Sequence, residues 1–232
     1  MNEKKKKMKF IFPPIIKTML VHESEQLLPV GKIYCVGRNY EDHAKEMGGM
    51  VDRDQPFFFS KPPQSINQSS QISFPTQTND LQHEVELVVL LGSKCSNVEV
   101  GQAHEHIFGY AVGVDLTKRD LQKIAKDSGK PWDLSKGFDD SAPISSVLKC
   151  EKKVLREGII ELAVNGITKQ SNNISNMVWQ VDEIISWLSK FITLKQGDII
   201  FTGTPAGVGK LDLGDKIDAS IEGIGRLSFS LN

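Results

Sequence analysis

The sequence predicts an α+β fold that is mainly β. Short apolar segments with an alternating pattern recur along the 232-residue chain, many of them late in the sequence, whereas few segments between them have helical spacing. Many strands late in the chain, with few helices that could serve as crossover connections, point to an α+β or mainly β fold. We therefore expect a single globular domain over residues 10–232, preceded by a disordered basic tail at residues 1–9.

Eight segments have the composition of strands. They are rich in β-branched and other apolar residues and are bounded by glycine, proline, asparagine or aspartate. In chain order the expected strands are residues 32–36, 56–60, 84–91, 109–115, 159–165, 198–202, 216–221 and 225–231. The Asn165-Gly166 pair that ends the fifth segment predicts a tight turn, because both residues tolerate a positive φ.

Four segments are expected to be helices. They are residues 40–47, 99–106, 118–128 and 176–191. The last has the clearest pattern, with apolar residues at helical spacing at positions 177, 178, 181, 184, 185, 188 and 191. Thr117 and Asp120 have the spacing of a capping box at the start of the third helix.

The charge balance and cysteine pattern exclude several classes of protein. The net charge is −1, which gives no electrostatic footprint for nucleic acid or an anionic membrane; the lysine run at residues 4–7 is expected to be a solvated tail. No apolar stretch approaches the roughly 18 residues that cross a bilayer. Three widely spaced cysteines without metal-binding spacing indicate reduced thiols. We therefore expect a cytoplasmic protein.

Two carboxylates stand within the apolar stretch HEVELVVLLG, residues 83–92. Side chains alternate across a strand, so Glu84 and Glu86 should project from one face and Val85, Leu87 and Val89 from the other. Two like charges on a half-buried face are costly unless a cation lies between them. The alternative is an exposed edge strand whose glutamates keep it soluble, and the stretch alone does not decide between the two.

Asp115 offers a third carboxylate at the end of another buried strand, in GYAVGVDLTKRD. Together with Glu84 and Glu86 it would form an all-oxygen, anionic ligand set. Such a set suits a hard cation such as Mg²⁺, Mn²⁺ or Ca²⁺ and does not suit zinc. Mg²⁺ usually retains water molecules, which a chelating substrate can replace.

Two further motifs bear on function. His43 and Glu46, in GRNYEDHAKEM, are three residues apart on a short predicted helix, so the carboxylate could orient the imidazole as a general base. The polar stretch GGMVDRD that follows is typical of a lid. GTPAGVGKL lacks the glycine at position 204 and the serine or threonine at 211 that a phosphate loop needs. Its glycines at 203, 207 and 209 still predict tight turns or close approaches.

Five stretches, in order, give the chain its resemblance to a known family: VGRNYEDHAKEM, HEVEL, GYAVGVDLTKRDLQ, PWDLSKGFDDSAP and GDIIFTGTPAGVG. Together they resemble the fumarylacetoacetate hydrolase family, above all its short acylpyruvase and oxaloacetate decarboxylase or tautomerase members. The resemblance implies a mixed β-roll, one catalytic domain and a homodimer. It further implies that Glu84, Glu86 and Asp115 bind Mg²⁺ or Mn²⁺, and that His43, Glu46 and Lys136 are catalytic. Substrate-binding or supporting roles are implied for Arg38, Lys61, Arg119, Gln122 and Thr204.

Such a site suits a small 2-oxo acid. The metal would stabilise the enolate that forms when the substituent on C3 departs, and Lys136 would add positive charge beside it. Acylpyruvate hydrolysis, oxaloacetate decarboxylation and oxaloacetate keto-enol tautomerisation can all use this site. We expect hydrolysis, because a water-activating His43–Glu46 dyad has little purpose in simple decarboxylation. A non-catalytic metal-binding protein is the alternative of another class.

Overall fold

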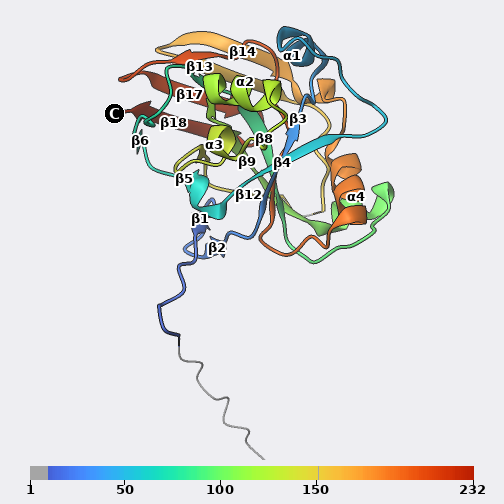
Figure 1. The fold of residues 1–232 in the computed structure, drawn as a ribbon. Helices are drawn as coiled ribbons and strands as arrows, with labels where there is room; N and C mark the ends of the chain where they lie inside the picture. The colour runs from blue at the N-terminus through green and yellow to red at the C-terminus, as the bar shows by residue number, and fades with distance from the viewer. Residues whose placement is uncertain (1–9, 151) are drawn as a thin grey trace, which may run out of the picture.

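The computed structural model describes residues 10–150 and 152–232, so the expected tail at residues 1–9 lies outside the described residues. The mainly β fold is confirmed: two large twisted sheets pack face to face and the helices are short (Figure 1). The first sheet has the order β12-β9-β8-β15-β3-β4 and the second has the order β14-β13-β17-β18-β6.

The strands of the first sheet are β3 (Ile33–Gly37), β4 (Phe57–Lys61), β8 (Val85–Leu91), β9 (Ile107–Val114), β12 (Leu148–Lys149) and β15 (Ile199–Phe201). Those of the second are β6 (Gln71–Ile72), β13 (Ile159–Val164), β14 (Ile167–Asn173), β17 (Lys216–Ile221) and β18 (Gly225–Leu231). Smaller sheets are formed by β1 (Thr18–Leu20) with β2 (Leu27–Pro29), by β5 (Ile66–Asn67) with β11 (Ala142–Pro143), and by β10 (Thr117–Lys118), β7 (Leu81–His83) and β16 (Gly209–Leu211).

The α-helices are α1 (Glu41–Glu46), α2 (Arg119–Asp127), α3 (Asp133–Lys136) and α4 (Val181–Phe191). Three 3₁₀ turns, η1 (Pro63–Ser65), η2 (Val100–His106) and η3 (Ile174–Asn176), complete the described elements. Among the described residues, no helix has the length and apolar character that crossing a membrane requires.

Strand β8 is buried on both faces, which explains its nearly continuous apolar sequence. Val85, Leu87, Val89 and Leu91 belong to the large core, which also takes residues from the second sheet and α4. Val88 and Leu90 belong to a second core on the opposite face of the first sheet. The alternation expected for this stretch is therefore confirmed, and Glu84 and Glu86 precede the residues of the second core along the same face.

Two expected helices differ from the structure. Residues 100–106 form the 3₁₀ turn η2 and not an α-helix. The helix expected at residue 176 begins at Val181, because Asn173 caps the preceding turn η3 through a 2.9 Å bond from the Ser175 N–H. The Gln180 N–H then donates to the Glu183 carboxylate at 2.8 Å and starts α4.

The capping box expected at residues 117 and 120 is also wrong. The Thr117 hydroxyl donates to the Asp115 carbonyl at 3.2 Å, and the Asp120 carboxylate accepts from the Thr78 hydroxyl at 2.7 Å and the Asn79 N–H at 2.9 Å. Within the helix, Asp120 accepts from the adjacent Leu121 N–H, at 2.9 Å, and the N-cap position is held by Lys118 without a side-chain bond, so Thr117 and Asp120 do not form the reciprocal pair of a capping box. The tight turn at Asn165 and Gly166 is confirmed, with φ angles of 52° and 78°.

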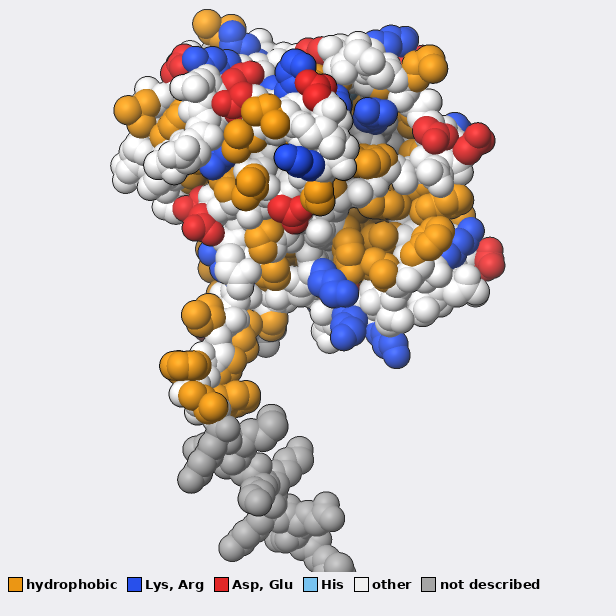
Figure 2. Space-filling model, viewed as in Figure 1, with side chains coloured by type: hydrophobic (Ala, Val, Ile, Leu, Met, Phe, Trp, Pro, Cys, Tyr) orange, Lys and Arg blue, Asp and Glu red, His pale blue; other side chains and the backbone are white. Residues whose placement is uncertain are grey.

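The first described residues extend away from the domain (Figure 1). Five of the seven residues at 10–16 are large and apolar, and they are between 61% and 93% exposed (Figure 2). Pro13 and Pro14 interrupt this stretch and favour an extended backbone. Within the described chain, these side chains therefore stay outside both cores.

Candidate active site

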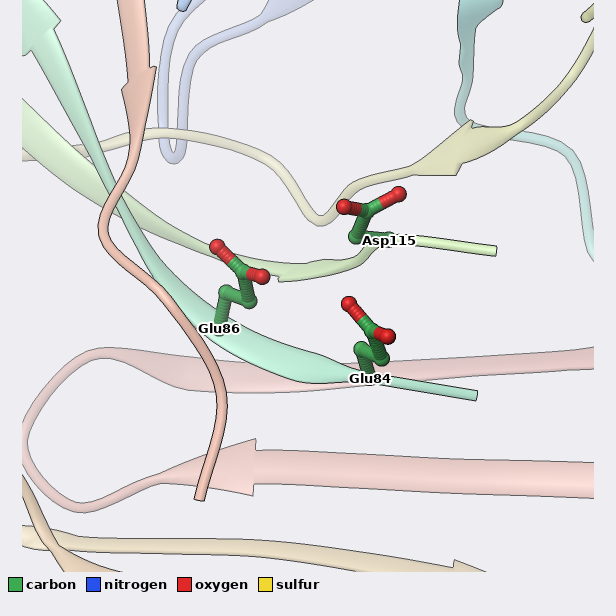
Figure 3. A group of neighbouring side chains, drawn as sticks. All are labelled: Glu84, Glu86 and Asp115. Carbon is green, nitrogen blue, oxygen red and sulfur yellow. The ribbon is translucent and has the colours of Figure 1, made fainter. Parts of the chain in front are cut away.

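The pairing of β8 with β9 brings the three predicted carboxylates together. Val85 pairs with Val114, so Glu84 and Asp115 lie at the adjoining ends of the two strands, and the Asp115 N–H donates to the Glu84 carbonyl at 2.8 Å. Glu84, Glu86 and Asp115 each offer an oxygen within 4.8 Å of the others (Figure 3). All three residues are at most 5% exposed, and β8 is a central strand, so the exposed-edge alternative is wrong.

Two buried lysines partly neutralise this carboxylate cluster. The Lys136 Nζ atom lies 2.7 Å from an oxygen of Glu84 and 2.7 Å from an oxygen of Asp115. Burial alone would lower the pKa of Lys136, but these carboxylates outweigh it and raise the pKa above its ordinary value. Lys61 forms an ion pair with Asp115 at 2.7 Å. Its ammonium also donates to the carbonyls of Leu116 and Ser141, which places Lys61 beneath the cluster.

Arg119 holds Glu84 from the side of helix α2. Its guanidinium donates to a Glu84 carboxylate oxygen, to Gln82 Oε1 at 2.8 Å and to Gln122 Oε1 at 2.6 Å. Burial alone would raise the pKa of Glu84, but the charges of Lys136, Arg119 and His43 hold it well below its usual range. Glu84 is therefore ionised and held in a fixed position.

Glu86 differs from its two neighbours in its charge balance. Its carboxylate accepts a 2.7 Å hydrogen bond from the Gly203 N–H, but among the described residues no lysine or arginine forms an ion pair with it. Burial raises the pKa of Glu86 well above its usual range, and the carboxylates of Asp115 and Glu84 add to that effect. A cation bound by all three carboxylates would supply the missing charge. The donors are hard oxygens, so the residues present fit Mg²⁺ or Mn²⁺.

Two glycines of the 203–209 loop are required by close approaches at this site. Gly203 has a φ of +97°, and a Cβ atom there would lie 2.6 Å from the Asn39 Cβ. Gly207 has a φ of +96°, and its N–H donates to the Glu46 carboxylate at 3.2 Å. The expectation of tight turns is therefore confirmed for these two positions, whereas Gly209 lies in strand β16 without a positive φ.

His43 and Glu46 contact each other at the end of α1. The His43 Nδ1 atom lies 3.2 Å from Glu46 Oε2, and the His43 side chain is 8% exposed. The GGMVDRD stretch that follows is tied to α4, because Arg53 donates to both carboxylate oxygens of Glu183, at 2.6 and 3.2 Å. The Trp179 indole N–H also donates to the Asp52 carbonyl at 3.0 Å. The stretch is therefore fastened to α4 and to the segment directly before it.

One pocket, the active-site pocket, collects most of the predicted residues. The predicted residues that line it are Arg38, His43, Glu84, Glu86, Arg119, Gln122, Lys136 and Thr204. Asp115, Lys61 and Glu46 lie behind them, in contact with Lys136, Asp115 and His43 respectively. The pocket is also lined by residues that the sequence interpretation missed: Val36, Gly37, Met47, Phe59, Lys126 and Trp132.

A buried hydrogen-bond chain behind Thr204 was also missed. Gln170, which is fully buried, donates to the Thr204 hydroxyl at 2.8 Å. Its carbonyl oxygen lies 2.9 Å from His83 Nδ1 and accepts from the Val85 N–H at 3.1 Å. Gln170 lies in the polar sequence ITKQSNN, which carries no signal for a buried position. The one signal in the sequence was His83, a polar residue directly before Glu84 that needs a hydrogen-bond partner if it is buried.

The Fumarylacetoacetate (FAA) hydrolase C-terminal family model matches residues 32–232. The chain belongs to this family. A fumarylpyruvate hydrolase from Ralstonia sp is a relative within it, 43% identical over 188 residues that cover 80% of this chain and 98% of the relative. The mitochondrial oxaloacetate tautomerase FAHD1 of Homo sapiens is 41% identical over 201 residues, which cover 86% of this chain and 90% of that protein.

A solved structure from the family supports the fold and the metal chemistry. The fumarylpyruvate hydrolase from Pseudomonas aeruginosa, in complex with Mn²⁺ and pyruvate, superposes with a TM-score of 0.93 at 39% sequence identity. The match covers 96% of this chain and 99% of that one. This relative binds a divalent metal, and the carboxylate cluster of the present chain has the ligand chemistry to do the same.

Proposed function

We propose that this protein is a Mg²⁺- or Mn²⁺-dependent hydrolase that cleaves the C–C bond of acylpyruvates and releases pyruvate and a carboxylic acid. The observation that carries the proposal is that a buried three-carboxylate cluster and a His–Glu pair meet at one pocket: Glu84, Glu86 and His43 line it, and Asp115 and Glu46 lie directly behind them. The similarity to fumarylpyruvate hydrolases makes fumarylpyruvate the first substrate to test. Glu84, Glu86 and Asp115 would hold the metal.

The bound metal would supply Lewis acidity at the carboxylate and 2-oxo group of the substrate. The remaining chemistry falls to the chain itself. His43, oriented through Nδ1 by Glu46, would take a proton from water at Nε2. The resulting hydroxide adds to the acyl carbonyl carbon C4, the C3–C4 bond breaks, and its electrons form the enolate of pyruvate. The acyl group would leave as a carboxylic acid, and transfer of the proton from His43 to C3 would complete pyruvate and restore the base.

Lys136 would stabilise the enolate by charge. Its ammonium is held between Glu84 and Asp115, lines the active-site pocket and therefore needs no rearrangement when negative charge develops. Arg119 and Gln122 would fix the Glu84 side of the cluster, and Lys61 the Asp115 side. Arg38 and Thr204 line the same pocket and would contact the substrate.

Oxaloacetate chemistry is the second candidate, favoured by the similarity to the human oxaloacetate tautomerase. Decarboxylation or keto-enol exchange would use the same cluster without water attack. A panel of substrates decides between the two candidates. The rates of conversion are measured side by side, in the presence of Mg²⁺, for acetylpyruvate, fumarylpyruvate, keto-oxaloacetate and enol-oxaloacetate. We expect the acylpyruvates to react fastest. Conversion of oxaloacetate without acylpyruvate cleavage would favour the second candidate, and equal background rates on all four would favour a non-catalytic metal-binding protein.

The assembly and location of the protein are further parts of the proposal. We expect a homodimer, which is supported by the exposed apolar residues at positions 10–16 (Figure 2). A cytoplasmic location is supported by three free cysteines. We further propose that residues 10–232 act as a single catalytic domain. Light scattering coupled to size exclusion measures the mass, and a monomer at micromolar concentration would contradict the dimer.

A further inference from the structure

Three cationic side chains line the active-site pocket in addition to Lys136. They are Arg38, which follows β3, and Arg119 and Lys126 on helix α2. Arg119, Gln122 and Lys126 are spaced i, i+3 and i+7, so they lie along one face of α2, and all three line the pocket. Lys126 stands two turns, about 10 Å of helix rise, beyond Arg119. The cationic face therefore runs from the carboxylate cluster away along α2.

The three cations differ in whether a carboxylate of the protein neutralises them. Arg119 is engaged by Glu84, Gln82 and Gln122. Arg38 and Lys126, in contrast, form no ion pair with any carboxylate in residues 10–150 and 152–232. Burial lowers the pKa of Lys126, and the charges of Arg38 and Arg119 lower it further, which indicates that the three cations share one region. Two like charges facing one pocket without a counter-ion are typical of an anion-binding site.

The backbone at Arg38 supports the same interpretation. Its φ is +58°, in the left-handed region that costs an arginine of order 1 kcal/mol. The next residue, Asn39, fixes this conformation: it is fully buried and bonds to the Trp179 carbonyl at 2.9 Å and the Thr202 carbonyl at 2.7 Å. Gly49 lies against the guanidinium, where a Cβ atom would be 3.4 Å from the Arg38 Cζ atom. A strained backbone that the fold holds in place beside a pocket points to a functional role for the residue, and Arg38 lines this pocket.

An aromatic pair lines the same pocket. Phe59 and Trp132 have ring centroids 5.5 Å apart, and the Lys136 Nζ atom lies 5.0 Å from the centre of the Phe59 ring. Aromatic faces favour contact with a flat, conjugated chain. The pocket thus combines a cluster suited to the 2-oxo acid end of a substrate, an aromatic wall, and two cations without a carboxylate partner.

We propose that Lys126 and Arg38 bind the second carboxylate of a diacid substrate, so that the enzyme selects dicarboxylic over monocarboxylic acylpyruvates. This inference rests on the proposed hydrolase function and assigns its specificity. Lys126 would act as a specificity-determining residue that contacts the end of the acyl chain remote from the bond that breaks. The contact would be a charge-assisted hydrogen bond, the stronger kind in proteins.

The test compares fumarylpyruvate with acetylpyruvate, both with Mn²⁺, in the full chain. Lys126→Met should lower kcat/KM for fumarylpyruvate by about tenfold or more relative to acetylpyruvate, because one charge-assisted bond is lost. Lys126→Arg, which keeps the positive charge, should retain most of the preference for fumarylpyruvate over acetylpyruvate. Lys123→Met is the matched control: Lys123 is on the same helix, its side chain is 76% exposed, and it pairs with Asp127 outside the pocket. This control should leave both rates unchanged.

A change in the substrate completes the test. Fumarylpyruvate methylated on its remote carboxylate should lose rate with the unmodified enzyme and lose little further with Lys126→Met. Equal losses on both acids in Lys126→Met, or no loss on either, would overturn the carboxylate subsite while leaving the hydrolase function intact. No cleavage of either acid by the unmodified protein would overturn the hydrolase function and, with it, this inference.

Discussion

The Nδ1 atom of His43 lies 3.2 Å from Oε2 of Glu46, three residues along the same short helix. The Glu46 carboxylate is itself held by the Gly207 N–H at 3.2 Å. His43 thus has one ring nitrogen occupied by a fixed carboxylate and one left for the pocket. This is the arrangement of an oriented general base.

Replacing His43 tests the role of this pair. His43→Ala should reduce kcat for acylpyruvate hydrolysis by about 100-fold or more, because water would lose its proton acceptor. Mn²⁺ affinity, measured by titration calorimetry, should change little, since His43 is not among the three carboxylates that we propose as ligands. His22→Ala is the control, because that side chain is 56% exposed. Full hydrolysis by His43→Ala would show that the pair has another purpose.

A second prediction concerns the loop that holds Glu86. Gly203→Ala should destabilise the protein by about 2 kcal/mol or more, because it places a Cβ 2.6 Å from the Asn39 Cβ at a φ of +97°. For a chain of this size, the midpoint of thermal unfolding should fall by roughly 4–8 °C. Gly209→Ala is the matched control, since its Cβ would meet His83 Nε2 at an ordinary 3.4 Å. Equal stability of the two variants would contradict the strained turn.

The buried histidine behind Thr204 should make stability depend on pH. Burial lowers the pKa of His83, although the bond with Gln170 opposes this, so the folded protein binds the His83 proton less tightly than the unfolded chain does. The stabilisation is therefore present above the unfolded pKa of about 6.5 and is lost as pH falls.

A variant isolates that contribution. Between pH 7.5 and pH 5.5, the unmodified protein should lose up to ~1 kcal/mol more unfolding free energy than His83→Gln, which has no such proton to take up. Denaturant unfolding at the two pH values measures the difference, and the other histidines cancel because both proteins contain them. An equal loss in the two proteins would show that the folded protein binds the His83 proton as tightly as the unfolded chain does, and would contradict the lowered pKa.

The sequence predicted those parts of the fold that depend on local pattern. The alternation in β8 placed Glu84 and Glu86 on one face, and the Asn165-Gly166 pair gave its turn. The start of α4 was wrong because Met177 and Val178 fit helical spacing, yet Asn173 and Gln180 cap two separate elements. Side-chain caps decide where a helix begins, and the spacing of apolar residues carries no information about these caps.

The candidate site was predictable to the extent that its residues carry chemistry in their own segments. Paired glutamates and a His–Glu pair can be recognised within ten residues of sequence, and the five stretches supplied the rest by resemblance. Lys126 and Gln170 were missed because their importance comes from tertiary position. In the sequence, Lys126 is indistinguishable from the other polar residues of a surface helix, and only the structure places it at the pocket. Gln170 lies in a polar strand, and its burial depends on the packing of β14 beside β13.

The most direct test of the central claim is the metal dependence of fumarylpyruvate cleavage, followed as release of pyruvate. The unmodified protein should lose its activity in a chelator and regain it when Mg²⁺ or Mn²⁺ is added in excess. Glu86→Gln, which removes one of the three carboxylates but can still accept the Gly203 N–H bond, should remain inactive at the same metal concentration. Full cleavage by the chelated protein, or by Glu86→Gln, would contradict the account.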